Sequence, residues 1–130
     1  MNIEPAKFAT ALNCMDGRVQ KPVTEWIRSE YTVDYVDMVT KPGIDKVLSE
    51  GSVQDIEELK NYVTISVKEH GSHLVVITGH QDCAGDPVDV ETHHRQIKKA
   101  VSVVKSWNLE VKIVGLFVNK NFVITVVCGN

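Results

Sequence analysis

Short apolar runs alternate along this chain with longer stretches in which apolar residues recur every three to four positions. A short run rich in β-branched residues is typical of a strand covered on both faces, whereas the longer spacing is typical of a helix with one buried face. The runs predict five strands, at residues 8–12, 32–40, 74–78, 111–118 and 122–127. We expect the last two to be antiparallel, because Asn119-Lys120-Asn121 between them has the composition of a tight turn.

Helices are predicted between these strands. Pro22 suits the first position of a helix through Ile27, because its fixed φ is already helical. Ser52 is a suitable N-cap for a second helix, which ends before Gly71, and a third runs from about Glu91 to Trp107. The expected inward faces of the two long helices are Val53, Ile56, Leu59, Val63 and Val67 in the second, and Ile97, Ala100, Val101 and Val104 in the third.

Strands that alternate with helices imply an α/β fold with a mostly parallel sheet of about five strands, the last strand being antiparallel. Right-handed crossovers place helices on both faces of such a sheet. The chain has 130 residues and no internal repeat or linker, so we expect a single domain over residues 1–130.

Composition and charge narrow the range of partners. The hydrophobic fraction of 43% and the charged fraction of 24% are those of a soluble protein, and no apolar stretch is long enough to span a membrane. The net charge of −3, with no Lys/Arg-rich run, gives no reason to expect nucleic acid. The N-terminal residues lack the pattern of a signal peptide, and the three cysteines need no disulfide partners. We expect a cytoplasmic protein with free thiols.

Two segments with reactive side chains each follow a predicted buried strand. Cys14-Met15-Asp16-Gly17-Arg18 follows the first strand, and Gly79-His80-Gln81-Asp82-Cys83-Ala84-Gly85 follows the third. In open α/β sheets, ligands bind at the carboxyl ends of strands, where the strand order reverses. If the first and third strands are neighbours, Cys14, His80 and Cys83 converge as two thiolates and one imidazole.

This ligand set suits Zn²⁺, because two cysteines and one histidine with an open fourth position form a known catalytic arrangement. Two thiolates weaken zinc as a Lewis acid, so a nearby acceptor that orients bound hydroxide would help, and Asp16 is close enough in sequence. Arg18 could pair bidentately with Asp16 and hold it away from the metal. An unpaired Asp16 could instead become the fourth ligand and close the site.

The same segments resemble the signatures of β-class carbonic anhydrases, Cys-x-Asp-x-Arg and Gly-His-x-x-Cys. Their order and separation match, and the resemblance extends over nearly the whole chain. It implies zinc on Cys14, His80 and Cys83, an Asp16–Arg18 dyad, reversible hydration of CO₂ to bicarbonate by zinc-bound hydroxide, and a dimeric unit.

The chain also departs from that family pattern, as a minimal or divergent member would. Only thirteen residues precede Cys14, where family members usually carry a helical arm. Lys41-Pro42-Gly43-Ile44 stands where Arg-Asn-Ala-Gly is typical, and the Gln that commonly helps bind substrate has no evident match. Two alternatives therefore stay open: a hydrolase of carbonyl sulfide or carbon disulfide, and a non-catalytic zinc module closed by Asp16 or Cys128.

Other candidate chemistry is weaker. A nucleobase deaminase needs His-x-Glu and Pro-Cys-x-x-Cys, and a thiol oxidoreductase needs Cys-x-x-Cys; neither pattern occurs. His93 and His94 are expected on a solvated surface near a helix start rather than in a proton relay, and Cys128 is expected to be a plain, partly buried thiol. The two last strands carry apolar residues on both faces, which predicts a homodimer or larger assembly.

Overall fold

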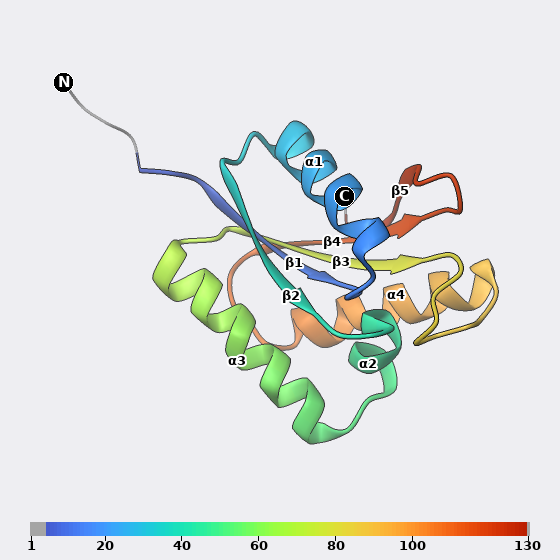
Figure 1. The fold of residues 1–130 in the computed structure, drawn as a ribbon. Coiled ribbons are helices and arrows are strands. Elements are labelled where there is room, and N and C mark those ends of the chain that lie inside the picture. Colours follow the sequence, from blue (N-terminus) through green and yellow to red (C-terminus); the bar gives the residue numbers. More distant parts are fainter. Residues whose placement is uncertain (1–4, 130) are drawn as a thin grey trace.

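The computed structural model describes residues 5–129. In this part of the chain, five strands form one sheet in the order β2-β1-β3-β4-β5 (Figure 1). The first four strands are parallel to one another, and β5 is antiparallel to β4. The strands are β1 (Phe8–Asn13), β2 (Tyr35–Thr40), β3 (Leu74–His80), β4 (Lys112–Val118) and β5 (Ile124–Cys128). The helices are α1 (Gln20–Tyr31), α2 (Ile44–Glu50), α3 (Val53–His70) and α4 (Val90–Lys105), with a 3-10 turn at Gly17–Val19 before α1.

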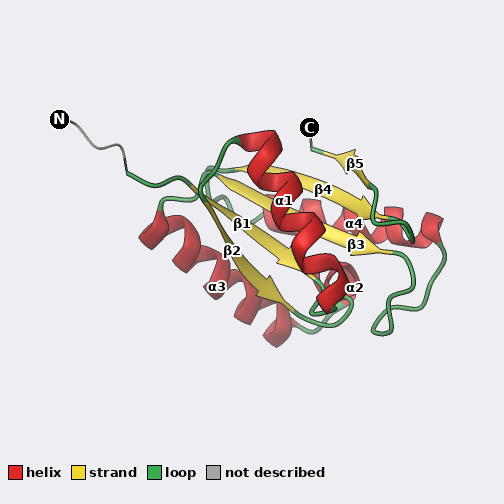
Figure 2. Ribbon diagram, turned by 45° about the horizontal axis from the view of Figure 1, so that its top comes forward, coloured by secondary structure: helices red, strands yellow, loops and turns green. Residues whose placement is uncertain are grey.

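Helices cover both faces of the sheet, as the pattern predicted (Figure 2). On one face, Val23 and Ile27 of α1 pack against apolar residues of β1, β3 and β4. On the other face, α2, α3 and α4 bury a second apolar cluster against the same strands. Every residue of β3 is buried, because this strand lies at the centre of the sheet and is covered from both sides.

The predicted helix signals are largely confirmed. The Ser52 side chain accepts a hydrogen bond from the backbone N–H of Asp55, and Gly71 ends α3 in the left-handed conformation. The first helix begins at Gln20 rather than Pro22, because the 3-10 turn leads directly into it. The short helix α2 was not predicted. It begins immediately after Gly43, whose φ of 61° turns the chain, and has no side-chain cap that would mark its start in the sequence.

Two further expectations need correction. Val53 was placed on the buried face of its helix but is 84% exposed, because α3 turns only its later residues, from Leu59 onward, to the sheet. Phe122 was placed in the last strand but lies in the turn before it, with a φ of 61°. The last strand therefore runs from Ile124 to Cys128.

Less of the β4–β5 hairpin is exposed than the sequence led us to expect. Helices α1 and α4 pack on opposite faces of β4, which is buried from Ile113 to Val118. Within this hairpin, it is β5 and its turn that leave large apolar side chains exposed, namely those of Phe122, Val123 and Val126. Among the described residues, no helix is both long enough and apolar enough to cross a membrane.

Candidate metal centre

The order of the strands places the two reactive segments side by side. Strand β1 pairs in parallel with β3, so both strands end at the same edge of the sheet. The chain leaves β1 toward β2 on one side and returns to β3 on the other, which makes this edge the point where the strand order reverses. Cys14 directly follows β1, His80 is the last residue of β3, and Cys83 lies in the loop after it.

The structure brings Cys14, His80 and Cys83 together. Their ligand atoms all lie within 4.8 Å of one another, and each residue is at most 4% exposed. The two sulfur atoms are 3.9 Å apart. Two sulfurs bound to a tetrahedral zinc at 2.3 Å stand about 3.8 Å apart, so the observed spacing fits this metal.

The imidazole of His80 is oriented for ligation. Its Nδ1 lies 2.9 Å from the backbone carbonyl of Gln81, and because a carbonyl only accepts, Nδ1 carries the proton. The lone pair is then on Nε2, which is buried and has no hydrogen-bond partner among residues 5–129. A metal-binding histidine uses this arrangement, in which a backbone acceptor fixes the tautomer and the other nitrogen binds the ion.

The surroundings of the two thiols favour negative charge on sulfur. The hydrogen bond from Cys83 lowers the pKa of Cys14 well below its usual range, against the opposing effect of burial, and backbone N–H groups of Asp16 and Gly43 add to it. The pKa of Cys83 is raised, first by its hydrogen bond to Cys14 and then by burial. A divalent cation binds thiolates, so its binding would displace the proton that this pair holds.

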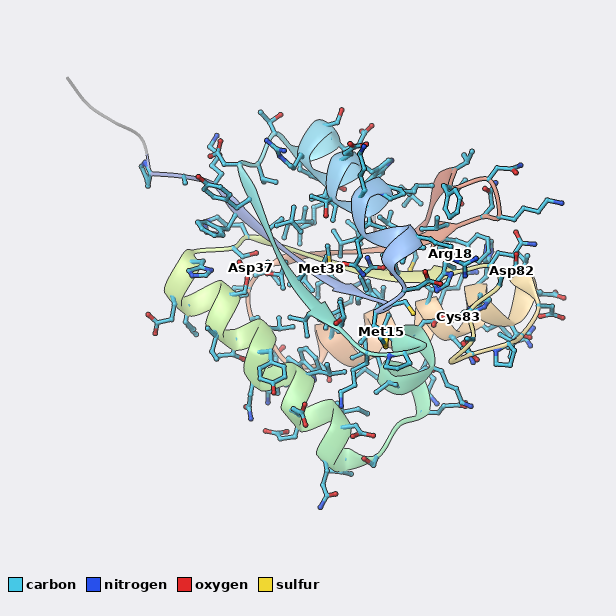
Figure 3. All side chains as sticks on the ribbon, in the orientation of Figure 1. Met15, Arg18, Asp37, Met38, Asp82 and Cys83 are labelled. Atoms are coloured by element: carbon cyan, nitrogen blue, oxygen red, sulfur yellow. The ribbon has the colours of Figure 1, made fainter. Side chains whose placement is uncertain are left out.

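Asp16 and Arg18 form the predicted pair beside this centre. The Arg18 Nη2 lies 2.6 Å from Asp16 Oδ2, its Nε lies 3.1 Å from both carboxylate oxygens, and its backbone N–H donates to Oδ1. The hydrogen bonds from Arg18 lower the pKa of Asp16 to about 2. Arg18 Nη2 also lies 3.3 Å from the backbone carbonyl of Asp82, so one guanidinium joins both segments (Figure 3).

A buried hydrogen bond between side chains holds the ends of β1 and β3 together. The amide oxygen of Asn13 accepts from the Thr78 hydroxyl at 2.6 Å and from the backbone N–H of Cys14 at 3.0 Å. Its amide nitrogen donates to the carbonyl of Val19 at 3.2 Å. Asn13 thus fixes the backbone of the first candidate ligand relative to the strand that ends in the second.

Comparison with known families agrees with this geometry. Residues 4–128 match the model of a family described as "Putative carbonic anhydrase". The chain belongs to this family. A search of curated proteins finds no match.

Solved structures show the same fold for this family member. It resembles the β-carbonic anhydrase isoform I of Trichomonas vaginalis, with a TM-score of 0.64, 17% identity, and coverage of 99% of this chain and 86% of that one. It also resembles a carbonic anhydrase from Glaciozyma antarctica, with a TM-score of 0.62, 16% identity, and coverage of 98% of this chain and 85% of that one. The apo form of a carbon disulfide hydrolase is similar as well, with a TM-score of 0.57, 14% identity, and coverage of 93% of this chain and 79% of that one. At these identities the likeness establishes the α/β fold.

A second buried polar cluster in this carbonic-anhydrase family member was not predicted. His93 was expected on the surface, but it is fully buried and its Nδ1 lies 2.7 Å from Asp45 Oδ2 and 3.5 Å from Asp86 Oδ2. Burial is the main cause of the raised pKa of Asp86, and the charge of Asp45 adds to it. The helical spacing contained the signal: the inward stripe that begins at Ile97 reaches His93 when it is extended back by one turn.

Cys128 lies apart from both clusters. It is the last residue of β5, it is half-buried, and its sulfur lies against Gly115 of β4. Burial raises the pKa of its thiol. Its position agrees with the expectation of a plain, partly buried thiol.

The link between Asn13 and Thr78 predicts a measurable loss of stability. Thr78→Val preserves the shape of the side chain but removes the hydroxyl, so it is expected to lower the free energy of unfolding by about 1 kcal/mol, as measured by urea denaturation. Thr64→Val is the matched control, because the Thr64 hydroxyl bonds only to the carbonyl of Lys60 in its own helix. Equal midpoints for Thr78→Val and the unmodified protein would show that the link contributes nothing.

Proposed function

We propose that this chain binds one Zn²⁺ through Cys14, His80 and Cys83 and catalyses the reversible hydration of CO₂ to bicarbonate. The observation that carries the proposal is the convergence of two thiols and an unpartnered imidazole nitrogen at the edge of the sheet where the strand order reverses. Membership of a carbonic-anhydrase family supports the same reaction.

Zinc at such a centre acidifies water and so supplies a nucleophile near neutral pH. The protein contributes the orientation of the reacting groups. Asp16 is the hydrogen-bond acceptor beside the candidate ligands, and Arg18 holds its carboxylate ionised and binds both of its oxygens. Because Asp16 is engaged by Arg18, the arrangement supports an open fourth position better than a site closed by Asp16.

A related substrate is the second candidate. The fold is shared with a carbon disulfide hydrolase, and carbon disulfide and carbonyl sulfide have the same linear geometry as CO₂. The same zinc-loaded protein can be given each substrate in parallel. Turnover of carbon disulfide without hydration of CO₂ would reassign the reaction and leave the metal centre in place.

The proposed ligands predict the metal content. Protein purified with zinc is expected to hold about one Zn²⁺ per chain by elemental analysis, and Cys83→Ser is expected to lose it, because a hydroxyl replaces thiolate poorly as a zinc ligand. Cys128→Ser is the matched control and should keep its metal. Unchanged zinc content in Cys83→Ser would reject the assignment.

The Asp16–Arg18 pair predicts a loss of activity with metal still bound. Arg18→Ala frees the carboxylate to reach the metal, so CO₂ hydration followed by stopped flow should fall at least tenfold while zinc content stays near one. Arg28→Ala, which removes an exposed arginine of α1, is the control. Full activity in Arg18→Ala would show that the pair is incidental to catalysis.

We also propose that the protein is a homodimer or larger assembly in which β5 lies at the interface. This edge strand and its turn expose Val126, Val123 and Phe122, whereas an edge strand in a monomer usually carries charged or kinking residues. Two-fold dimers are the commonest assemblies and would cover this edge.

Light scattering at micromolar concentration tests the assembly. The expected mass is at least twice the 14.5 kDa of one chain. Val126→Lys places a charge on the exposed edge and should shift the mass toward that of the monomer. Val53→Lys makes the same change at an exposed valine of α3 and should not. A monomeric mass for the unmodified protein would contradict the proposal.

A further inference from the structure

The buried cluster of Asp45, His93 and Asp86 joins three segments that are distant in sequence. Asp45 lies in the first turn of α2, His93 in the first turn of α4, and Asp86 in the loop that carries Cys83. All three side chains are at most 2% exposed. The Nδ1 atom of the imidazole faces both carboxylates: it lies within hydrogen-bond distance of Asp45 Oδ2, at 2.7 Å, and within ion-pair distance of Asp86 Oδ2, at 3.5 Å.

Both acidic residues of this cluster also contact a segment that bears a candidate metal ligand. Asp45 packs against Gly79, the residue before His80, so closely that a Cβ at position 79 would stand 2.5 Å from Asp45 Oδ2. Asp86 donates its backbone N–H to the carbonyl of Cys83 at 3.2 Å. His93 therefore connects the backbone before one ligand to the loop that carries another.

The loop after β3 needs such an anchor. His80 is fixed by the sheet, but residues 81–89 contain no helix or strand. The beginning of the loop is held by Gln81, whose backbone N–H bonds to Val118 and whose side chain accepts from the N–H of Lys120. Beyond Cys83, the buried polar anchor is Asp86, which lies against His93 and accepts weakly from Gln96 at 3.4 Å.

We propose that His93 and Asp86 are positioning residues for the metal centre, which hold the Cys83 loop at the distance from His80 that a tetrahedral ion requires. The inference rests on the proposed zinc site and adds residues that neither bind the metal nor touch substrate. Groups behind the ligands of a metal centre typically change its affinity by about 10- to 100-fold when they are mutated. His93 acts through Asp45 and Asp86 rather than by its own contact with the ion.

The experiment measures zinc affinity by competition with a chelator, together with the absorption of the Co²⁺-substituted protein, whose thiolate bands report the geometry at sulfur. His93→Leu removes the bridge. Asp86→Ala removes the contact of the loop with His93, together with the weak hydrogen bond from Gln96, and leaves the Asp45–His93 pair intact, so it keeps the test usable if His93→Leu does not fold. Both are expected to weaken zinc binding about 10- to 100-fold and to shift the Co²⁺ spectrum.

Two further variants separate positioning from general stability. His93→Asn places an amide N–H close to the position of Nδ1 and is expected to restore most of the affinity. Val63→Ala opens a cavity in the core under α3, away from the loop, and should lower the melting temperature without changing zinc affinity. Amide hydrogen exchange of residues 83–86 in metal-free protein should be faster in Asp86→Ala than in the unmodified protein, and this readout needs no metal.

The outcomes distinguish this inference from the proposed function. Wild-type affinity in His93→Leu or Asp86→Ala, or an equal loss in Val63→Ala, would overturn it. A second metal equivalent that disappears with His93→Leu would also overturn it, because the cluster would then be a cation site of its own. If the unmodified protein binds no zinc, the proposed function fails, and hydrogen exchange of metal-free Asp86→Ala and His93→Leu, each compared with the unmodified protein, still decides whether these residues hold the loop.

Discussion

The parallel pairing of β1 with β3 brings the carboxyl ends of two central strands to one edge of the sheet. Cys14 and His80 emerge there within reach of each other, although they are far apart in sequence. Asn13 and Thr78 reinforce the pairing with a buried side-chain hydrogen bond, one residue beyond the last paired positions, Leu12 and Ile77. Because both faces of these strands are packed, a shift in their register would move side chains from one apolar cluster to the other, so packing energy protects the geometry of the site.

The site is enclosed by two polar links of different character. On the exposed side, the half-exposed guanidinium of Arg18 joins Asp16 to the backbone of Asp82, and solvent screens this contact. On the buried side, His93 joins Asp45 to Asp86 without access to water. Removing one partner from the buried link would leave a buried polar group without its partner, which costs more than the loss of a contact that water can replace.

The exposed link has a chemical consequence that the buried one lacks. Arg18 lowers the pKa of Asp16 to about 2, so this carboxylate is ionised throughout the neutral range and remains a hydrogen-bond acceptor. The buried groups lie behind the backbone that carries the candidate ligands. The Asp16–Arg18 pair thus stands beside the candidate metal centre, and the Asp45, His93 and Asp86 cluster stands in the framework.

The sequence by itself determined the α/β class, the strand runs, the caps at Ser52 and Gly71, and the two ligand-bearing segments, because these follow from local spacing and residue type. It did not reveal α2, whose seven residues are too few for a periodic signal and whose start depends on the turn at Gly43. Tertiary structure alone decided that β1 lies beside β3, that Val53 is exposed, and that Asp45 and Asp86 both meet His93. These features arise from contacts between residues distant along the chain, which no local pattern encodes.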